Sequence, residues 1–448
     1  MADTAGATPP DPASLIRSRR FVVLLVLAAL VGVVASLAAW AFLEVVHQIQ
    51  VGVYFDDAPT WWPLPVLAVA GIVTAFAIVR LPGNGGHVPA RGLNAGATQP
   101  VELPGVMLAA IASIGLGVVL GPEAPLIALG GGLGLLAIRL VRADAPAEVG
   151  TVMAAAGTFA ALSMIFGSPL IAAVILIEAT GLGGPKLPLV LLPGLMAAGI
   201  GSLVSIGMGS FTGLSSSDFA LGSLTLPAFA RPDVADFGWS IALAIVVTLG
   251  ALAILRLARE VERVATGRAF VALPLAGLAV AGLAIAFGQA TDKAFHEVLF
   301  SGQDDLEGLV SSASTWSLGA LALVIACKGI AYGISLGTFR GGPIFPAIFL
   351  GVAAGMMASH LPGFELTPGV AVGMAASVAA VLRLPLAAVV VATLLTSNAG
   401  LGASPLIIVA VVVAYVTTMI ISAPRTTSQP AADTPRPAPP PAVAGVRG

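Results

Sequence analysis

The chain has 448 residues, of which 58 % are hydrophobic and only 9 % are charged, and its mean hydropathy is +1.02. So much apolar sequence excludes a soluble globular domain and indicates an integral membrane protein. The net charge of -2 gives no reason to expect a nucleic-acid partner, and the single cysteine, Cys327, excludes a disulfide within the chain.

The first predicted membrane helix runs from Phe21 to Phe42 and follows a polar tail, residues 1–20. This apolar run is too long for the core of a signal peptide, and more apolar runs follow it. Arginines at the end of the tail predict a cytoplasmic N-terminus, because loops rich in Lys and Arg stay on that side of the membrane. The external segment that follows is expected from His47 to Thr60. We therefore expect a multi-pass protein of a bacterial plasma membrane.

The rest of the chain divides into two apolar regions and two polar ones. Many of the apolar segments are interrupted by Gly and Pro, and some are too short to span a bilayer. The predicted parts are a first membrane half at 21–206, an external linker at 207–237, a second membrane half at 238–422 and a disordered Pro/Ala-rich tail at 423–448.

A repeated motif relates the two halves. Residues 121–130 and 342–351 share the pattern G-P-x-x-P-x-I-x-L-G at an offset of 221 residues, and 169–174 resembles 385–390 at an offset of 216. Internal duplication is common in transporter folds. The pattern predicts an all-α polytopic membrane protein with two inverted-topology halves and many broken, non-spanning helices. The helix starts near Pro122 and Pro343 should then approach each other.

Three glycine-rich helix starts, at 83–89, 121–125 and 341–346, are candidate anion sites. Helix N-termini present free N–H groups and partial positive charge, and several of them pointed at one place can bind an anion without a cationic side chain. Glu123 lies at one of these starts, inside apolar sequence, where a carboxylate is expensive. It either caps its own helix or competes with the anion as a gate or a station for protons.

These residues resemble the CLC family of chloride channels and chloride/proton antiporters. Residues 121–125 are similar to the motif G-R-E-G-P with its gating glutamate, 341–346 to G-G-x-F-x-P, and 85–89 to G-S-G-I-P. The resemblance covers about 20–422 and implies a homodimer with one anion pathway per subunit. Together with the helix starts it implies that anions are bound by the backbone at Gly85, Gly86, His87, Pro122, Ala124, Ile344 and Phe345.

The chain departs from the family pattern at several positions. The family serine that touches the ion falls on Gly86, and the inner proton-relay glutamate falls on Ala179, one residue after Glu178. Glu178 would project about 100° away from that position around a helix. It either replaces the missing proton acceptor or makes an interhelical hydrogen bond. We therefore predict no strong proton coupling through two glutamates. Lys328 is either an electrostatic attractor near the pathway or a side chain that snorkels to the interface.

The expected function is transport of a small inorganic anion, with chloride as the first candidate and protons as a second ion, by a channel or an exchanger. No enzyme activity, metal site or cofactor is expected, since no Ser/His pair or metal-ligand spacing stands out. The main alternative is a proton- or cation-coupled carrier for another solute, because Glu123 could equally bind a cation. A scaffold without transport would leave the repeated helix starts unexplained.

Overall fold

The computed structural model describes residues 18–55, 58–93, 96–181, 183–184, 187–212 and 221–422, and within these ranges it contains fifteen α-helices and no strand. Both predicted tails, apart from the last residues of the first, lie outside these ranges, as do Asp56, Asp57 and part of the predicted linker. The α-helices are α2 (Arg19–Val53), α3 (Pro63–Arg80), α4 (Leu103–Gly115), α5 (Glu123–Val141), α6 (Ala147–Phe166), α7 (Pro169–Thr180), α8 (Leu187–Thr212), α9 (Val234–Ala265), α10 (Ala269–Ala290), α11 (Asp305–Ser311), α12 (Leu318–Thr338), α13 (Ile344–Ala358), α14 (Leu366–Leu382), α15 (Pro385–Leu395) and α16 (Ser404–Ser422).

Long and short apolar helices are mixed along the chain. Among the described helices, nine are long and apolar enough to cross a membrane. Five further apolar segments, those of α4, α7, α13, α14 and α15, have 10–17 residues, whereas a full span needs about 20. This confirms the predicted all-α fold with broken, non-spanning helices.

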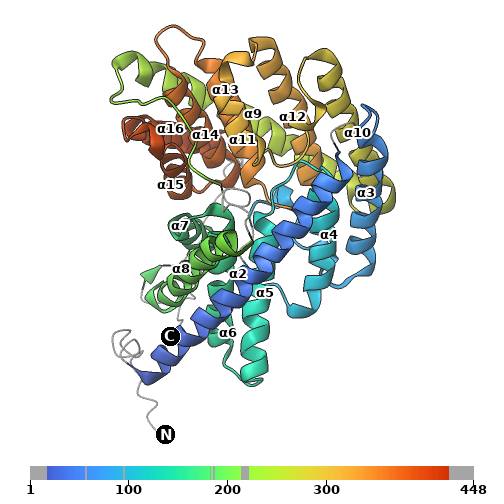
Figure 1. Cartoon of the computed structure of the whole chain (residues 1–448), viewed down its shortest axis with the longest axis vertical. Helices are drawn as coiled ribbons and strands as arrows, with labels where there is room; N and C mark the ends of the chain where they lie inside the picture. The colour runs from blue at the N-terminus through green and yellow to red at the C-terminus, as the bar shows by residue number, and fades with distance from the viewer. Residues whose placement is uncertain are drawn as a thin grey trace, which may run out of the picture.

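The two halves meet at their repeated glycines. Gly121 donates its N–H to the carbonyl of Gly342 at 2.8 Å, and Gly342 donates in return, so the two segments form one antiparallel bridge. From this bridge α5 and α13 extend in opposite directions, and α5–α8 and α13–α16 occupy opposite parts of the molecule (Figure 1). The expected meeting of the two helix starts is therefore confirmed.

The helix that follows each repeated motif packs on its neighbour through glycines. A Cβ atom on Gly130 of α5 would overlap the carbonyl of Gly157 in α6, and one on Gly351 of α13 would overlap that of Gly373 in α14. The positions are related by the same offsets as the sequence repeats, 221 for the first helix of each pair and 216 for the second. Equivalent helix pairs thus support the bridge on both sides.

Two predicted boundaries differ from the structure. The first membrane helix continues past Phe42 to Val53 and includes His47, which was expected in an external segment. The Gln50 amide donates to the carbonyl of Ile114, so this extension packs on the end of α4 and remains helical. The predicted linker 207–237 is also partly helical, since α8 ends at Thr212 and α9 begins at Val234.

Candidate functional site

Glu123 connects the two helix starts. It is the first residue of α5, its side chain is fully buried, and its Oε1 accepts the backbone N–H of Ile344, the first residue of α13. The carboxylate of one half therefore occupies a free N–H group at the helix start of the other half. Its second oxygen, Oε2, has no hydrogen-bond partner in the described part of the chain.

The glycines beside Glu123 are required by this close approach. A Cβ atom on Gly121 would overlap Oε2 of Glu123, and one on Gly342 would overlap its Cδ. Pro122 and Pro343 precede the two helices as their N-caps. Since a proline has no N–H, Pro343 leaves the Ile344 N–H as the first free donor of α13.

Tyr332 bonds the peptide group between Pro343 and Ile344 from the side opposite to Glu123. This fully buried residue of α12 donates its hydroxyl to the carbonyl of Pro343 at 2.6 Å. The Pro343 carbonyl and the Ile344 N–H belong to one peptide unit, so Tyr332 and Glu123 bond its two ends. Sequence reasoning missed Tyr332, although a tyrosine inside an apolar helix needs a partner for its hydroxyl.

Aromatic rings flank the start of α13. The ring of Phe345 stacks on that of Phe166, at the end of α6, with a centroid distance of 5.4 Å and an interplanar angle of 16°. Both residues are buried. Of the residues predicted to bind anions, Ile344 and Phe345 thus lie at the α13 start with Glu123, between packed aromatic side chains.

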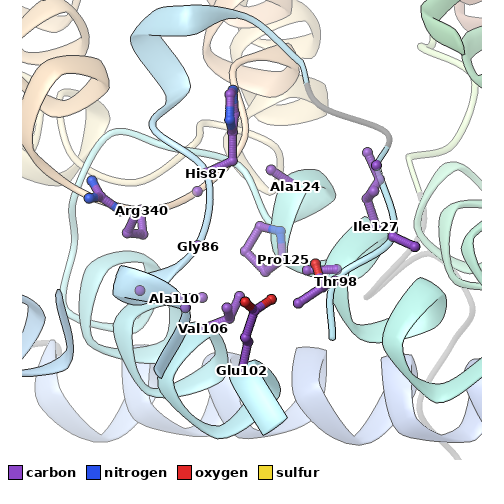
Figure 2. Close-up of a pocket in the computed structure, with 16 residues that line it drawn as sticks. Gly86, His87, Thr98, Glu102, Val106, Ala110, Ala124, Pro125, Ile127 and Arg340 are labelled. Atoms are coloured by element: carbon purple, nitrogen blue, oxygen red, sulfur yellow. The ribbon is translucent and has the colours of Figure 1, made fainter. Parts of the chain in front are cut away.

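Four other predicted residues line a common cavity of about 310 Å³. These are Gly85, Gly86, His87 and Ala124, and Figure 2 shows the last three around it together with Arg340. A second cavity of about 380 Å³ reaches Pro343 and Ala179.

The predicted helix start at 83–89 is wrong: this segment holds two short 3-10 turns, Pro82–Gly85 and Pro89–Arg91, because Gly83, Asn84, Gly85 and Gly86 have positive φ angles that no α-helix contains. The structure still brings this loop and the starts of α5 and α13 to one region, with one cavity beside the start of α5 and another beside the start of α13.

His87 is held within its own loop. Its Nε2 lies 2.7 Å from the carbonyl of Gly92 and donates to it. Burial lowers the pKa of His87 from its usual 6.5, and the nearby positive charges of Arg340 and Arg91 lower it further. The imidazole is therefore neutral near pH 7 and offers the cavity no charge.

Glu178 lies at a second contact between the halves. Its two carboxylate oxygens accept the N–H groups of Leu386 at 2.9 Å and Ala387 at 2.8 Å, at the start of α15. It thus makes interhelical hydrogen bonds, which was one of the two predicted roles. Its neighbour Ala179, where the resemblance would place a glutamate, lines the second cavity.

Lys328 does not reach an interface. It is fully buried in α12, donates to the carbonyls of Glu297 at 2.9 Å and Leu299 at 2.8 Å, and its Nζ lies 4.3 Å from the ring centre of Phe349. The snorkelling interpretation is therefore wrong. Lys328 fixes the segment before α11 against α13.

Buried helix starts that meet inside an all-helical, multi-pass membrane protein are typical of proteins that transport ions. The sequence profile of the voltage gated chloride channel family matches residues 86–419. The chain therefore belongs to that family, whose members are channels and transporters. Family membership supports anion transport by a channel or exchanger of the CLC type.

Known proteins resemble the chain over most of its length. The "Putative ion-transport protein YfeO" of Salmonella schwarzengrund is 30 % identical over 370 residues, which cover 76 % of this chain and 81 % of that protein. A slow cyanobacterial Cl⁻/H⁺ antiporter has a similar structure, with a TM-score of 0.71 and 18 % identity over 89 % of this chain and 95 % of that one. A CLC-type fluoride/proton antiporter has a TM-score of 0.67 and 17 % identity over 88 % of this chain and 95 % of that one. These two structures share the fold.

Proposed function

We propose that this protein carries chloride or a similar small inorganic anion through the region between the two cavities, with Glu123 as the gate. The observation that carries the proposal is the hydrogen bond from the Ile344 N–H to the Glu123 carboxylate. A helix start is a natural anion site, and here a tethered carboxylate occupies it. An anion can take this N–H group only after the carboxylate leaves.

Protonation provides a way for the carboxylate to leave. A neutral carboxylic acid is a much weaker acceptor than a carboxylate, because hydrogen bonds to ionised groups are roughly twice as strong. Once Glu123 is protonated, the Ile344 N–H is free to donate to an anion. Transport should then increase as the pH falls, and each opening moves one proton onto Glu123.

Glu178 is proposed to fasten the halves rather than to relay protons. Both of its oxygens already accept N–H groups of α15. A relay would need the carboxylate to turn away from these donors at each cycle. We therefore expect that any proton movement depends on Glu123 and does not need Glu178.

The proposed setting is a homodimer in a bacterial plasma membrane, with a cytoplasmic N-terminus. Exposed apolar side chains on α8 and α16, such as Leu203 and Ile420, support contact with lipid or with a second copy. The two antiporters with a similar fold support protons as a coupled ion. The anion preference follows from the family, whose description names chloride.

The test is to measure chloride and proton flux together in liposomes that contain the purified protein. The wild type should carry chloride faster at low pH. Glu123→Ala should carry chloride with little pH dependence and should move no protons, since the tethered carboxylate is gone. An unchanged pH profile in this variant would show that Glu123 is only a helix cap. A stoichiometric proton counterflow that disappears in Glu178→Gln would contradict the role given to Glu178.

A further inference from the structure

The 310 Å³ cavity ends beside Glu123, which is itself fully buried and can receive a proton only through the protein interior. Ala124, the residue after Glu123, and Gly341, the residue before Gly342, both line this cavity. The Gly342 backbone in turn touches the Glu123 carboxylate, because a Cβ atom on Gly342 would overlap its Cδ. The cavity therefore comes within one residue of the gate. It has room for several waters, since one water occupies about 30 Å³ of liquid volume.

Glu102 is the carboxylate that lines this cavity within the described part of the chain. It precedes α4 as its N-cap and is half-buried, and Figure 2 shows its carboxylate pointing toward Pro125 in the first turn of α5. A Cβ atom on Gly83 would lie 2.6 Å from the Cβ of Glu102, so the preceding loop fixes the base of this side chain. Glu102 is thus held at the wall of the cavity that leads to the gate.

The Glu102 carboxylate is only partly used by its own structure. Its Oε2 accepts the N–H of Gln99 at 3.0 Å, as part of a capping box. Its Oε1 makes no hydrogen bond, and the carboxylate no ion pair, with any residue that the structure describes. Arg139 of α5 donates to the side chain of Gln99 instead, at 2.7 Å. One carboxylate oxygen therefore remains available to water.

The other ionisable side chains near the gate are unsuited to delivering a proton. His87 is neutral, and its Nε2 is bonded within its own loop. Arg340 lies at the edge of the cavity in Figure 2, where its guanidinium points away from Glu102, and a guanidinium does not give up its proton. Glu178 has both oxygens bonded by α15, and the charged residues that line the second cavity are all arginines.

We propose that Glu102 is the proton donor to Glu123, with water in the 310 Å³ cavity between them. The inference rests on the proposed function, because it supplies the proton that releases the gate. Glu102 first takes a proton from water and becomes a carboxylic acid. Its O–H bond then breaks, the cavity water passes a proton on, and a new O–H bond forms on the Glu123 carboxylate. Glu102 is left as a carboxylate, and Glu123, now neutral, releases the Ile344 N–H.

The test is to measure protons moved per chloride in liposomes that contain Glu102→Gln. Glutamine also serves at this position of a capping box, so the variant keeps the bond to Gln99 but cannot carry a proton. Its ratio of protons to chloride should fall at least about tenfold below that of the wild type. Glu102→Asp keeps a carboxyl group and should retain part of the proton movement. Glu148→Gln, at an exposed position of α6, is the matched control and should keep the wild-type ratio.

The outcomes separate this inference from the proposed gate. A wild-type ratio in Glu102→Gln would show that Glu102 only caps its turn and overturns the inference, as does a wild type that moves no protons. Loss of proton movement in Glu123→Ala but not in Glu102→Gln rejects Glu102 and leaves the gate. Loss in Glu102→Gln, with an unchanged pH profile of chloride flux in Glu123→Ala, rejects the gate and leaves Glu102 as a proton carrier.

A second measurement uses the wild type and decides if Glu102→Gln does not fold. Carbodiimides couple to protonated carboxyl groups, so treatment of the protein in liposomes should label Glu102, as peptide mass spectrometry would show. Proton movement should fall in step with this label. An unlabelled Glu102, or proton movement that persists when Glu102 is labelled, overturns the inference.

Discussion

Glu123 and Glu178 make the same kind of contact between the halves, but they differ in how many of their carboxylate oxygens are hydrogen-bonded. Each is a glutamate of the first half that accepts N–H groups from the first turn of a short helix in the second half, α13 for Glu123 and α15 for Glu178. Glu178 is partly exposed, and both of its oxygens are bonded. Glu123 is fully buried, and its Oε2 has no partner in the described chain. One contact is saturated, and the other is not.

The difference shows how one contact can be permanent and the other releasable. An unpaired polar atom in a dry site costs free energy, about 1–3 kcal/mol for a buried acceptor. That cost destabilises the bound position of the Glu123 carboxylate and makes its departure easier. Glu178 gains nothing by leaving, because it would give up two hydrogen bonds. Burial with incomplete bonding therefore suits a gate, and complete bonding suits a fastener.

The largest expected effect separates the two glutamates by transport. Glu123→Gln should raise chloride flux at high pH about ten- to a hundredfold, because the charged hydrogen bond that closes the site is lost. Glu178→Gln should change this flux by less than about twofold, since the amide oxygen of glutamine can still accept one of the two α15 N–H groups and Glu178 does not close the site. Liposome efflux at two pH values measures both. Equal responses of the two variants would remove the distinction.

A second prediction concerns the contribution of Glu178 to the stability of the fold. Glu178→Ala leaves the start of α15 without two acceptors, so the free energy of unfolding should fall by about 2 kcal/mol. Thermal unfolding of the purified protein in detergent measures this loss. Glu148→Ala, at an exposed position in the first turn of α6, is the control and should lose less. A loss no larger than that of the control would show that Glu178 does not fasten the halves.

Glu297 is a partly buried glutamate that bonds no helix start, so it shows the effect of burial without such a contact. It lies between α10 and α11, its Oε2 has no partner in the described chain, and burial raises its pKa from 4.5 to about 7, with Asp305 acting in the same direction. Because the folded state holds this proton more tightly than the unfolded state, stability should fall as the pH rises from about 4.5 to 7.

The size of this effect is on the order of 1–2 kcal/mol once partial exposure is allowed for. Glu297→Gln should reduce the pH dependence by about this amount and leave the protein more stable at pH 8, as unfolding temperatures at pH 5 and pH 8 would show. Glu365→Gln, at an exposed position, should leave the slope unchanged. A slope as steep in Glu297→Gln as in the wild type would assign the pH dependence to other groups.

The smallest expected effect concerns the peptide that Glu123 shares with Tyr332. The Tyr332 hydroxyl polarises the Pro343–Ile344 peptide and strengthens its N–H as a donor. In the Glu123→Ala background, Tyr332→Phe should therefore weaken chloride binding about threefold. Ser335→Ala is the matched control, because its hydroxyl bonds only the Ala331 carbonyl of the same helix. Equal affinities in the two variants would show that the tyrosine acts only by packing.

The features of the site that follow from the internal repeat could be predicted from the sequence. The duplicated motif was sufficient to predict that the starts of α5 and α13 meet and that Glu123 lies there. Arg340 was missed because its burial depends on the loop that contains Asn84, 256 residues earlier. The partner of Glu178 could not be predicted for the same reason, since Leu386 is 208 residues away. Contacts across the two halves depend on how the halves dock, and no local pattern records that.

The bridge between Gly121 and Gly342 has a consequence for how such a protein can diverge. The two halves join there through main-chain atoms, which every amino acid carries, so the join does not depend on a particular pair of side chains. Mutation can break it mainly by adding a side chain where none fits, and it is otherwise free to alter the surroundings. A centre of this kind can persist while most other positions change, which fits a shared fold at 18 % identity. Proteins of this fold can therefore change their ion selectivity during evolution while the main-chain bridge between the halves stays the same.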